Sequence, residues 1–311
     1  MKRIGALLLL CAMLLAGCNA QEPCAQQTVF CMDTVMDLQI WGEDRQQAMD
    51  AIVEMLKDLE KTWSVTDENS LLSSLNRGQG EPNVQQQAFL DRAIALQQRT
   101  DGAFHPKLQS VVALWGFYDD NYRVPTAQQI AAAQAEENWD LGAVVKGYAG
   151  DLAVRILEQY DVDRAILNLG GNVQTYGEKP EEEPWKVGIQ NPDGGNNLGV
   201  LSLSGTVAVV TSGDYQRYFE QDGMRYHHIL NPETGCPAAS GLRSVTILCR
   251  DGMTADALST ALFVMGLEKA AEFWRQSEDF EAVLVLENGK IYATEGVQLS
   301  GCEYEVICRE N

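Results

Sequence analysis

Basic residues are scarce in this 311-residue sequence. Lysine and arginine together number 23 against 44 aspartates and glutamates, the formal net charge is −21, and there are only three histidines. Beyond Lys2 and Arg3 the basic residues form no run along the chain. Binding of nucleic acid or of anionic lipid headgroups depends on concentrated positive charge. We therefore expect neither as a partner.

The sequence also lacks an apolar segment long enough to cross a membrane as a helix. The apolar segment at residues 4–15 has 12 residues, whereas a span takes about 20. It follows Lys2 and Arg3 and ends in Leu15-Ala-Gly-Cys18, which is typical of an export signal and resembles a bacterial lipobox. We therefore predict a lipoprotein signal peptide at 1–17, a lipid on Cys18, a tether at 18–29 and one domain at 30–311. The protein would be lipid-anchored at the extracytoplasmic face of the cell membrane.

Cysteine spacings typical of a metal site are absent. No CxxC pair and no Cys/His cluster occurs. After Cys11 and Cys18, an even number of cysteines remains, which permits disulfides in an exported protein. The near pairs are 24 with 31 and 302 with 308, but a reducing environment would leave all of them free. We predict no particular pairing.

Helical and strand patterns are interspersed without strict alternation. Apolar spacing predicts a helix from Asp44 to about residue 63, with further helices at 84–99, near 126–135 and at 254–265. Strands are expected at 35–41, 165–169, 185–190, 199–203 and 243–248, and a final hairpin pairs 282–286 with 291–293. This order favours an α+β fold of mixed sheets with interspersed helices over a doubly wound sheet.

Two of the three histidines lie in one stretch, residues 211–235. We expect a strand at 207–210, a turn at Ser212-Gly-Asp214, and a second strand at 225–230 that ends in an Asn-Pro turn. This hairpin would bring His228 to the mouth of a turn. Neighbouring residues of a strand face opposite ways, so both histidines could equally well be structural.

Asp256 and Thr260 are four residues apart in an expected helix, so a carboxylate and a hydroxyl share one face. Hard oxygen ligands of this kind suit Mg²⁺. An aspartate in a first helical turn is, however, more often a complement to the helix dipole. Several loops rich in glycine, asparagine and aspartate surround a single lysine, Lys146, which would suit a pyrophosphate. No P-loop and no GxGxxG occurs.

Taken together, nine short pieces between about residues 30 and 266 resemble, in order, the FAD:protein FMN transferases, the ApbE-like flavin transferases of bacterial envelopes. The pieces are Met32-x-Thr34, Ser64-x5-Ser70-x-Leu72, Asp101-Gly-Ala-Phe104, Asp140-Leu-Gly-x3-Lys146-Gly-Tyr148, Asn168-x-Gly-Gly-Asn172, Trp185-x-Val-Gly-Ile189, Thr211-Ser-Gly-Asp-Tyr215, His228-Ile-x-x-Pro232-x-Thr-Gly235 and Asp256-Ala-x-Ser-Thr260.

The resemblance implies an ApbE-like fold and a Mg²⁺-dependent transfer of FMN from FAD to a threonine of an acceptor protein, with release of AMP. The acceptor would be a flavoprotein subunit of an envelope electron-transfer system. His228 is implied as the catalytic base, and Asp256, Thr260 and the carbonyl of Ala143 as Mg²⁺ ligands. The implied contacts to FAD are Met32, Thr66, Ala103, Phe104, His105, Asp140, Lys146 and Leu230.

This sequence departs from the family pattern at four positions. Asp33 stands where glycine is usual, Thr66 where an aromatic residue is frequent, and His105 and Asn231 where aspartate is usual. None of the four is a proposed metal ligand or His228. Two alternatives stay open: a FAD pyrophosphatase that uses water in place of threonine, and a flavin- or solute-binding lipoprotein without catalysis.

Overall fold

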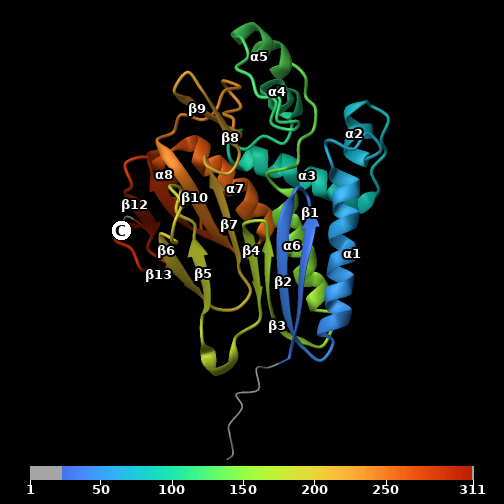
Figure 1. Cartoon of the computed structure of the whole chain (residues 1–311), viewed down its shortest axis with the longest axis vertical. Coiled ribbons are helices and arrows are strands. Elements are labelled where there is room, and N and C mark those ends of the chain that lie inside the picture. The colour runs from blue at the N-terminus through green and yellow to red at the C-terminus, as the bar shows by residue number, and fades with distance from the viewer. Residues whose placement is uncertain (1–22, 310–311) are drawn as a thin grey trace, which may run out of the picture.

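A nine-stranded sheet organises the computed structural model, which describes residues 23–309 (Figure 1). Its order is β1-β2-β3-β4-β7-β10-β11-β12-β14, and every neighbouring pair is antiparallel except β12 with β14. The strands are β1 (Cys24–Cys31), β2 (Thr34–Gly42), β3 (Val162–Leu169), β4 (Asn172–Tyr176), β7 (Ala208–Gly213), β10 (Leu242–Cys249), β11 (Phe280–Leu286), β12 (Ile291–Thr294) and β14 (Glu305–Ile307).

Helices cover one face of this sheet and a smaller sheet covers the other. Strand β11 shows the alternation: Ala282 and Leu284 pack with the helices, whereas Val283 and Val285 pack with the small sheet. The small sheet consists of β13 (Leu299–Ser300), β6 (Gly199–Leu203) and β5 (Trp185–Ile189). The helices are α1 (Arg45–Trp63), α2 (Leu71–Asn76), α3 (Val84–Arg99), α4 (Gln109–Trp115), α5 (Ala127–Gln134), α6 (Val145–Leu157), α7 (Gly252–Met265) and α8 (Leu267–Arg275). These layers confirm the predicted α+β class.

Helices α4 and α5 form a small lobe with the hairpin of β8 (Tyr218–Gln221) and β9 (Met224–His227) (Figure 1). Its core is aromatic: the rings of Phe219 and Tyr226 stack with centroids 5.1 Å apart, and Trp115 lies 5.6 Å from Tyr226. A two-stranded hairpin is only marginally stable alone. This packing therefore holds the hairpin in place and fixes the position of His228, which directly follows β9.

The stretch around the two histidines differs from the prediction. Strand β7 continues through Ser212 and Gly213, where a turn was expected, because β10 pairs with both of these residues. Strand β9 ends at His227 rather than at residue 230, and its partner is β8, not residues 207–210.

The predicted tether is also too long. Residues 24–29 belong to β1, which pairs along its whole length with β2 and turns Ala25 and Val29 into the core. Cys24 and Cys31 lie at opposite ends of this strand, so they do not pair, and the six cysteines of residues 23–309 are all free. The predicted signal peptide and Cys18 lie outside the described residues. No helix within 23–309 is long and apolar enough to span a membrane.

Candidate active site

A cavity of about 1210 Å³ lies where the turn between β1 and β2, the start of α6, the end of β7 and the residues after β9 meet. All of the predicted site residues line it, although they are spread over more than two hundred positions of the sequence. They are Met32, Thr66, Ala103, Phe104, His105, Asp140, Ala143, Lys146, His228, Leu230, Asp256 and Thr260.

Asp256 lies in the second turn of α7, not in the first. The helix begins at Gly252, and its N-cap is Asp251, whose carboxylate accepts the Thr254 N–H at 2.8 Å. The dipole interpretation of Asp256 is therefore wrong, since that effect is confined to the first turn. Asp256 is only 4% exposed. Burial raises the pKa of its carboxyl group, and the positive charge of Lys146 and the hydrogen bonds from Gly147 and Asn172 oppose this rise.

Two glycines let α6 reach this carboxylate. The Gly147 N–H donates to Oδ2 of Asp256 at 2.8 Å. A Cβ on Gly147 would lie 2.0 Å from the carbonyl oxygen of Gly252, so the two helices touch backbone to backbone at this point. The glycine after Lys146 is thus required by packing, and it brings the start of α6 against Asp256.

The oxygen atoms here fit a Mg²⁺ ion. Thr260 lies one turn beyond Asp256 in α7, Ala143 lies just before α6, and all three residues line the cavity together with Lys146. Residues 23–309 contain no group of three or more His, Cys, Asp or Glu side chains that could hold a metal. A buried carboxylate, a hydroxyl and a carbonyl leave further positions for water and phosphate, which is how Mg²⁺ is usually held.

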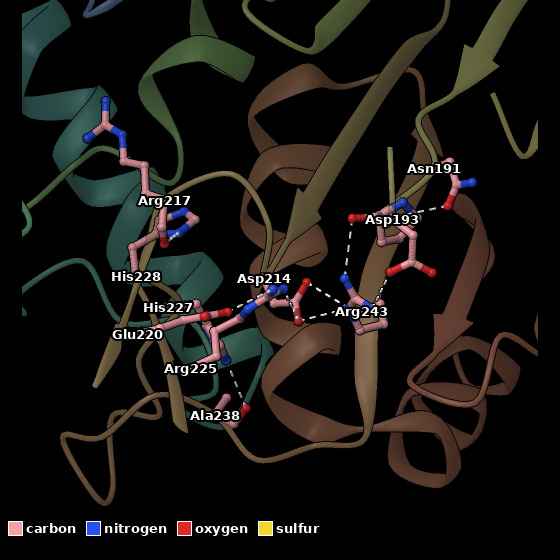
Figure 2. Close-up of polar contacts among 11 residues, drawn as sticks. Asn191, Asp193, Asp214, Arg217, Glu220, Arg225, His227, His228, Ala238 and Arg243 are labelled. Carbon is pink, nitrogen blue, oxygen red and sulfur yellow. Dashed lines mark hydrogen bonds and ion pairs between the residues drawn. The ribbon is translucent and has the colours of Figure 1, made fainter. Parts of the chain in front are cut away.

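His228 and His227 lie in different surroundings (Figure 2). His228 is half-buried and faces the cavity, and its Nδ1 lies 3.2 Å from the carbonyl oxygen of Arg217. A carbonyl only accepts, so Nδ1 carries the hydrogen and Nε2 keeps its lone pair. Burial, and after it the charges of His227 and Arg217, lower the pKa of His228, which keeps the ring neutral.

His227, by contrast, is buried away from the cavity. Its Nε2 lies 3.2 Å from the carbonyl oxygen of Ala238, and its ring packs against that of Phe263 in a T-shaped arrangement with centroids 5.4 Å apart. It is not part of the cavity wall. His227 is therefore a core residue, whereas His228 belongs to the cavity.

Asp140 is held by a residue that the sequence analysis missed. Its Oδ2 accepts the hydroxyl of Tyr118 at 2.6 Å, and its Oδ1 accepts the Gly142 N–H at 2.9 Å. Burial, together with the charge of Asp140, raises the pKa of Tyr118, so the phenol stays protonated and remains a donor. Tyr118 also lines the cavity. No motif marks it, and it contacts Asp140 only in the folded chain.

Two departures from the family pattern have structural consequences. Met32 and Asp33 form the two-residue turn between β1 and β2, both with positive φ (53° and 57°), a region that glycine adopts without cost. His105 accepts the Lys107 N–H at Nδ1, 3.2 Å away, so its Nε2 carries the hydrogen. Burial lowers the pKa of His105. A neutral N–H donor therefore lines the cavity where an aspartate would offer only acceptors.

Further polar groups face the cavity without having been predicted. The hydroxyl of Tyr215 is buried and lacks a hydrogen-bond partner among the described residues, and the Asn172 side chain is directed at the Asp256 carboxylate. Burial raises the pKa of Tyr215 to about 12, which keeps it a donor. Both residues belong to motifs that resemble the family pattern. Nothing else in the sequence indicated that they lie at the site. Arg217 and Ser212 complete this side of the wall.

Comparison with known proteins places this geometry in a family. A profile of the ApbE family matches residues 32–284. The FAD:protein FMN transferase of Klebsiella pneumoniae is 34% identical over 281 residues, which cover 82% of this chain and 86% of the relative. That of Treponema pallidum is 32% identical over 289 residues, 80% of each chain.

Solved structures agree with the sequence comparison. The ApbE protein of Thermotoga maritima superposes with a TM-score of 0.81 at 33% identity, over 88% of this chain and 98% of that one. The flavin transferase ApbE of Vibrio cholerae gives a TM-score of 0.76 at 26% identity, with the same coverage. This chain belongs to the ApbE family.

Proposed function

We propose that this protein is a FAD:protein FMN transferase, which moves FMN from FAD to a threonine hydroxyl of an acceptor protein. One observation carries the proposal beyond family membership. A neutral histidine with a free Nε2, a buried carboxylate and a lysine line a single cavity of about 1210 Å³, large enough for a dinucleotide.

The side chains of this cavity account for each part of the reaction. The threonine oxygen attacks the FMN phosphorus of FAD, the bond from that phosphorus to the AMP oxygen breaks, and AMP leaves. Nε2 of His228 takes the threonine proton, since Nδ1 is fixed on the carbonyl oxygen of Arg217. Lys146 places a positive charge beside the pyrophosphate, while the Tyr118–Asp140 pair holds the loop that leads into α6.

Asp256, Thr260 and the carbonyl of Ala143 would hold a Mg²⁺ ion. Bound there, the ion would neutralise negative charge on the pyrophosphate and on the departing AMP.

The test is a transfer assay on the full-length chain with FAD, Mg²⁺ and a candidate flavoprotein acceptor, read by flavin fluorescence of the acceptor in a denaturing gel. We expect labelling of the acceptor that both EDTA and Asp256→Ala abolish. His227→Ala, next to His228 but outside the cavity wall, is the control and should still label the acceptor. Labelling that survives both treatments would contradict the metal assignment. Release of AMP without acceptor labelling would favour a FAD pyrophosphatase.

We also propose that a lipid on Cys18 anchors the domain to the outer face of the cell membrane. The four residues ending at Cys18 support this. The chain enters β1 at the end of the molecule that lies away from α4, α5 and the β8–β9 hairpin (Figure 1). Met32, at the other end of β1, lines the cavity, and eight strand residues separate the two points by roughly 26 Å. An anchored domain would thus present its cavity away from the lipid. Equal membrane binding of Cys18→Ala and wild type would refute the anchor.

A further inference from the structure

Three hydroxyl groups form a chain beside Asp256. Ser212, in β7, lies 2.7 Å from the Ser259 hydroxyl and 3.3 Å from the Thr260 hydroxyl, both in α7. The Ser259 hydroxyl lies in turn 2.8 Å from the backbone carbonyl oxygen of Asp256. Ser259 is fully buried, so its hydrogen has only protein partners available.

The direction of each hydrogen bond in this chain follows from counting hydrogens. A carbonyl oxygen has none, so Ser259 donates to Asp256. Because the only hydroxyl hydrogen of Ser259 is donated there, Ser259 accepts a hydrogen bond from the Ser212 hydroxyl. Ser212 has then spent its hydrogen as well, so the remaining contact is made by Thr260, which donates to Ser212. The hydrogen of Thr260 therefore points along the chain, towards β7.

We propose that Ser212 and Ser259 are positioning residues that turn the hydrogen of Thr260 away from the cavity, so that this hydroxyl presents a lone pair to a divalent cation. A hydroxyl that ligates a cation must offer a lone pair, and a freely rotating one would have to be reoriented on binding. The inference rests on the proposed Mg²⁺ site and adds to it two residues that act on the cation through Thr260.

The end of β7 is fixed strongly enough for this role (Figure 2). Two residues beyond Ser212, the Asp214 carboxylate meets Nε of Arg243 at 2.9–3.0 Å, and its N–H donates to the Arg243 carbonyl oxygen at 3.0 Å. The Arg243 guanidinium also binds Asp193 at 3.0 Å. Ser212 is thus held by the pairing of β7 with β10 and by the partly buried ion pair of Asp214 and Arg243.

The experiment measures Mn²⁺ affinity of the full-length chain, from the EPR signal of free Mn²⁺, without any turnover. We expect Ser212→Ala and Ser259→Ala to weaken Mn²⁺ binding by about 10- to 100-fold, as loss of a group that orients a ligand does. Ser212→Thr keeps the hydroxyl and should restore wild-type affinity. Thr246→Val is the matched control, because it removes a buried hydroxyl of similar geometry, 2.8 Å from Thr211, on the neighbouring strand.

A double-variant comparison isolates the role of Thr260. Once Thr260→Val has removed the hydroxyl, Ser212→Ala should cause no further loss. Wild-type affinity in Ser212→Ala, failure of Ser212→Thr to restore binding, or additive losses would each overturn the proposal. If Asp256→Ala abolishes binding while Ser212→Ala keeps wild-type affinity, only the hydroxyl chain is wrong. If Asp256→Ala binds like wild type, the metal site itself is wrong, and the inference falls with it.

Discussion

Adding a single methyl group at Gly147 should disable the active site from outside the cavity. The new Cβ would lie 2.0 Å from the carbonyl oxygen and 2.6 Å from the carbonyl carbon of Gly252. Both are backbone atoms, so no side chain can rotate out of the way. Ordinary contact begins at 3.4 Å, and the helices α6 and α7 must therefore separate by about 1.4 Å.

The separation has two costs of different kinds. Overpacking of this sort destabilises a protein by about 1–3 kcal/mol, and a contact between backbones belongs at the upper end. Alanine recovers about 1 kcal/mol as the better helix former, which leaves a net loss of about 2 kcal/mol. The hydrogen bond from Gly147 to Asp256, now 2.8 Å, would lengthen beyond hydrogen-bond range. A misplacement of about 1 Å among catalytic groups lowers rates by about 100-fold.

Gly150 provides the matched control, since it lies one turn further along α6. A Cβ there meets only the side chain of Gln174, at 3.1 Å, which can yield. Gly150→Ala should therefore be neutral or up to about 1 kcal/mol stabilising, and fully active. Urea unfolding should separate the two variants by about 2–3 kcal/mol, and the FMN transfer assay by about 100-fold. Equal stability and equal activity would refute the close helix contact as the reason for the glycine.

Three further outcomes follow from the site. His228→Ala should slow FMN transfer by at least about 100-fold. His227→Ala should lower the free energy of unfolding by about 1–3 kcal/mol and leave the transfer rate per folded molecule unchanged. The reverse result would mean that His227 is the base and His228 the structural residue. In the ligand-free protein, burial and the nearby Arg217 lower the pKa of His228 below its ordinary value of 6.5. The NMR signal of its ring should therefore stay that of neutral imidazole from about pH 7.5 to about pH 6. A titration midpoint of the ring at 6.5 or above would contradict this effect of burial and of Arg217. Asp33→Gly should raise the free energy of urea unfolding by about 0.5–1 kcal/mol, because it relieves a left-handed backbone at φ 57°; an unchanged or lower value would show that the aspartate makes compensating contacts.

Elements with a strong local pattern were predicted from the sequence. Helix α1 ends at Trp63 and buries Ala48, Ile52 and Leu56 on one face, as their spacing indicated. The terminal hairpin of β11 and β12 was found as well, because a turn signal separates two apolar runs. In both cases the residues that decide the structure are neighbours in the sequence.

The stretch 207–230 was predicted less well because its strands are defined by distant partners. Ser212 and Gly213 are strand residues only because Val245 and Ser244 pair with them. The same limit applies to the site. Family resemblance supplied Asp140, and helical spacing together with that resemblance supplied Thr260, but their partners Tyr118 and Ser212 lie 22 and 48 residues away in sequence. Such contacts leave no periodic pattern that a single sequence could reveal.

The start of α7 shows how one missed helix boundary changes the meaning of a residue. Local propensity places the start at Thr254, because glycine is a poor helix former, and Asp256 then falls in the first turn. The structure starts the helix at Gly252, where the missing side chain admits the backbone of Gly147. That contact moves Asp256 into the second turn, beyond the reach of the dipole effect. The backbone contact with Gly147 therefore explains both features: it requires glycine at position 252, and it places the Asp256 carboxylate in the cavity wall and not at the end of the helix.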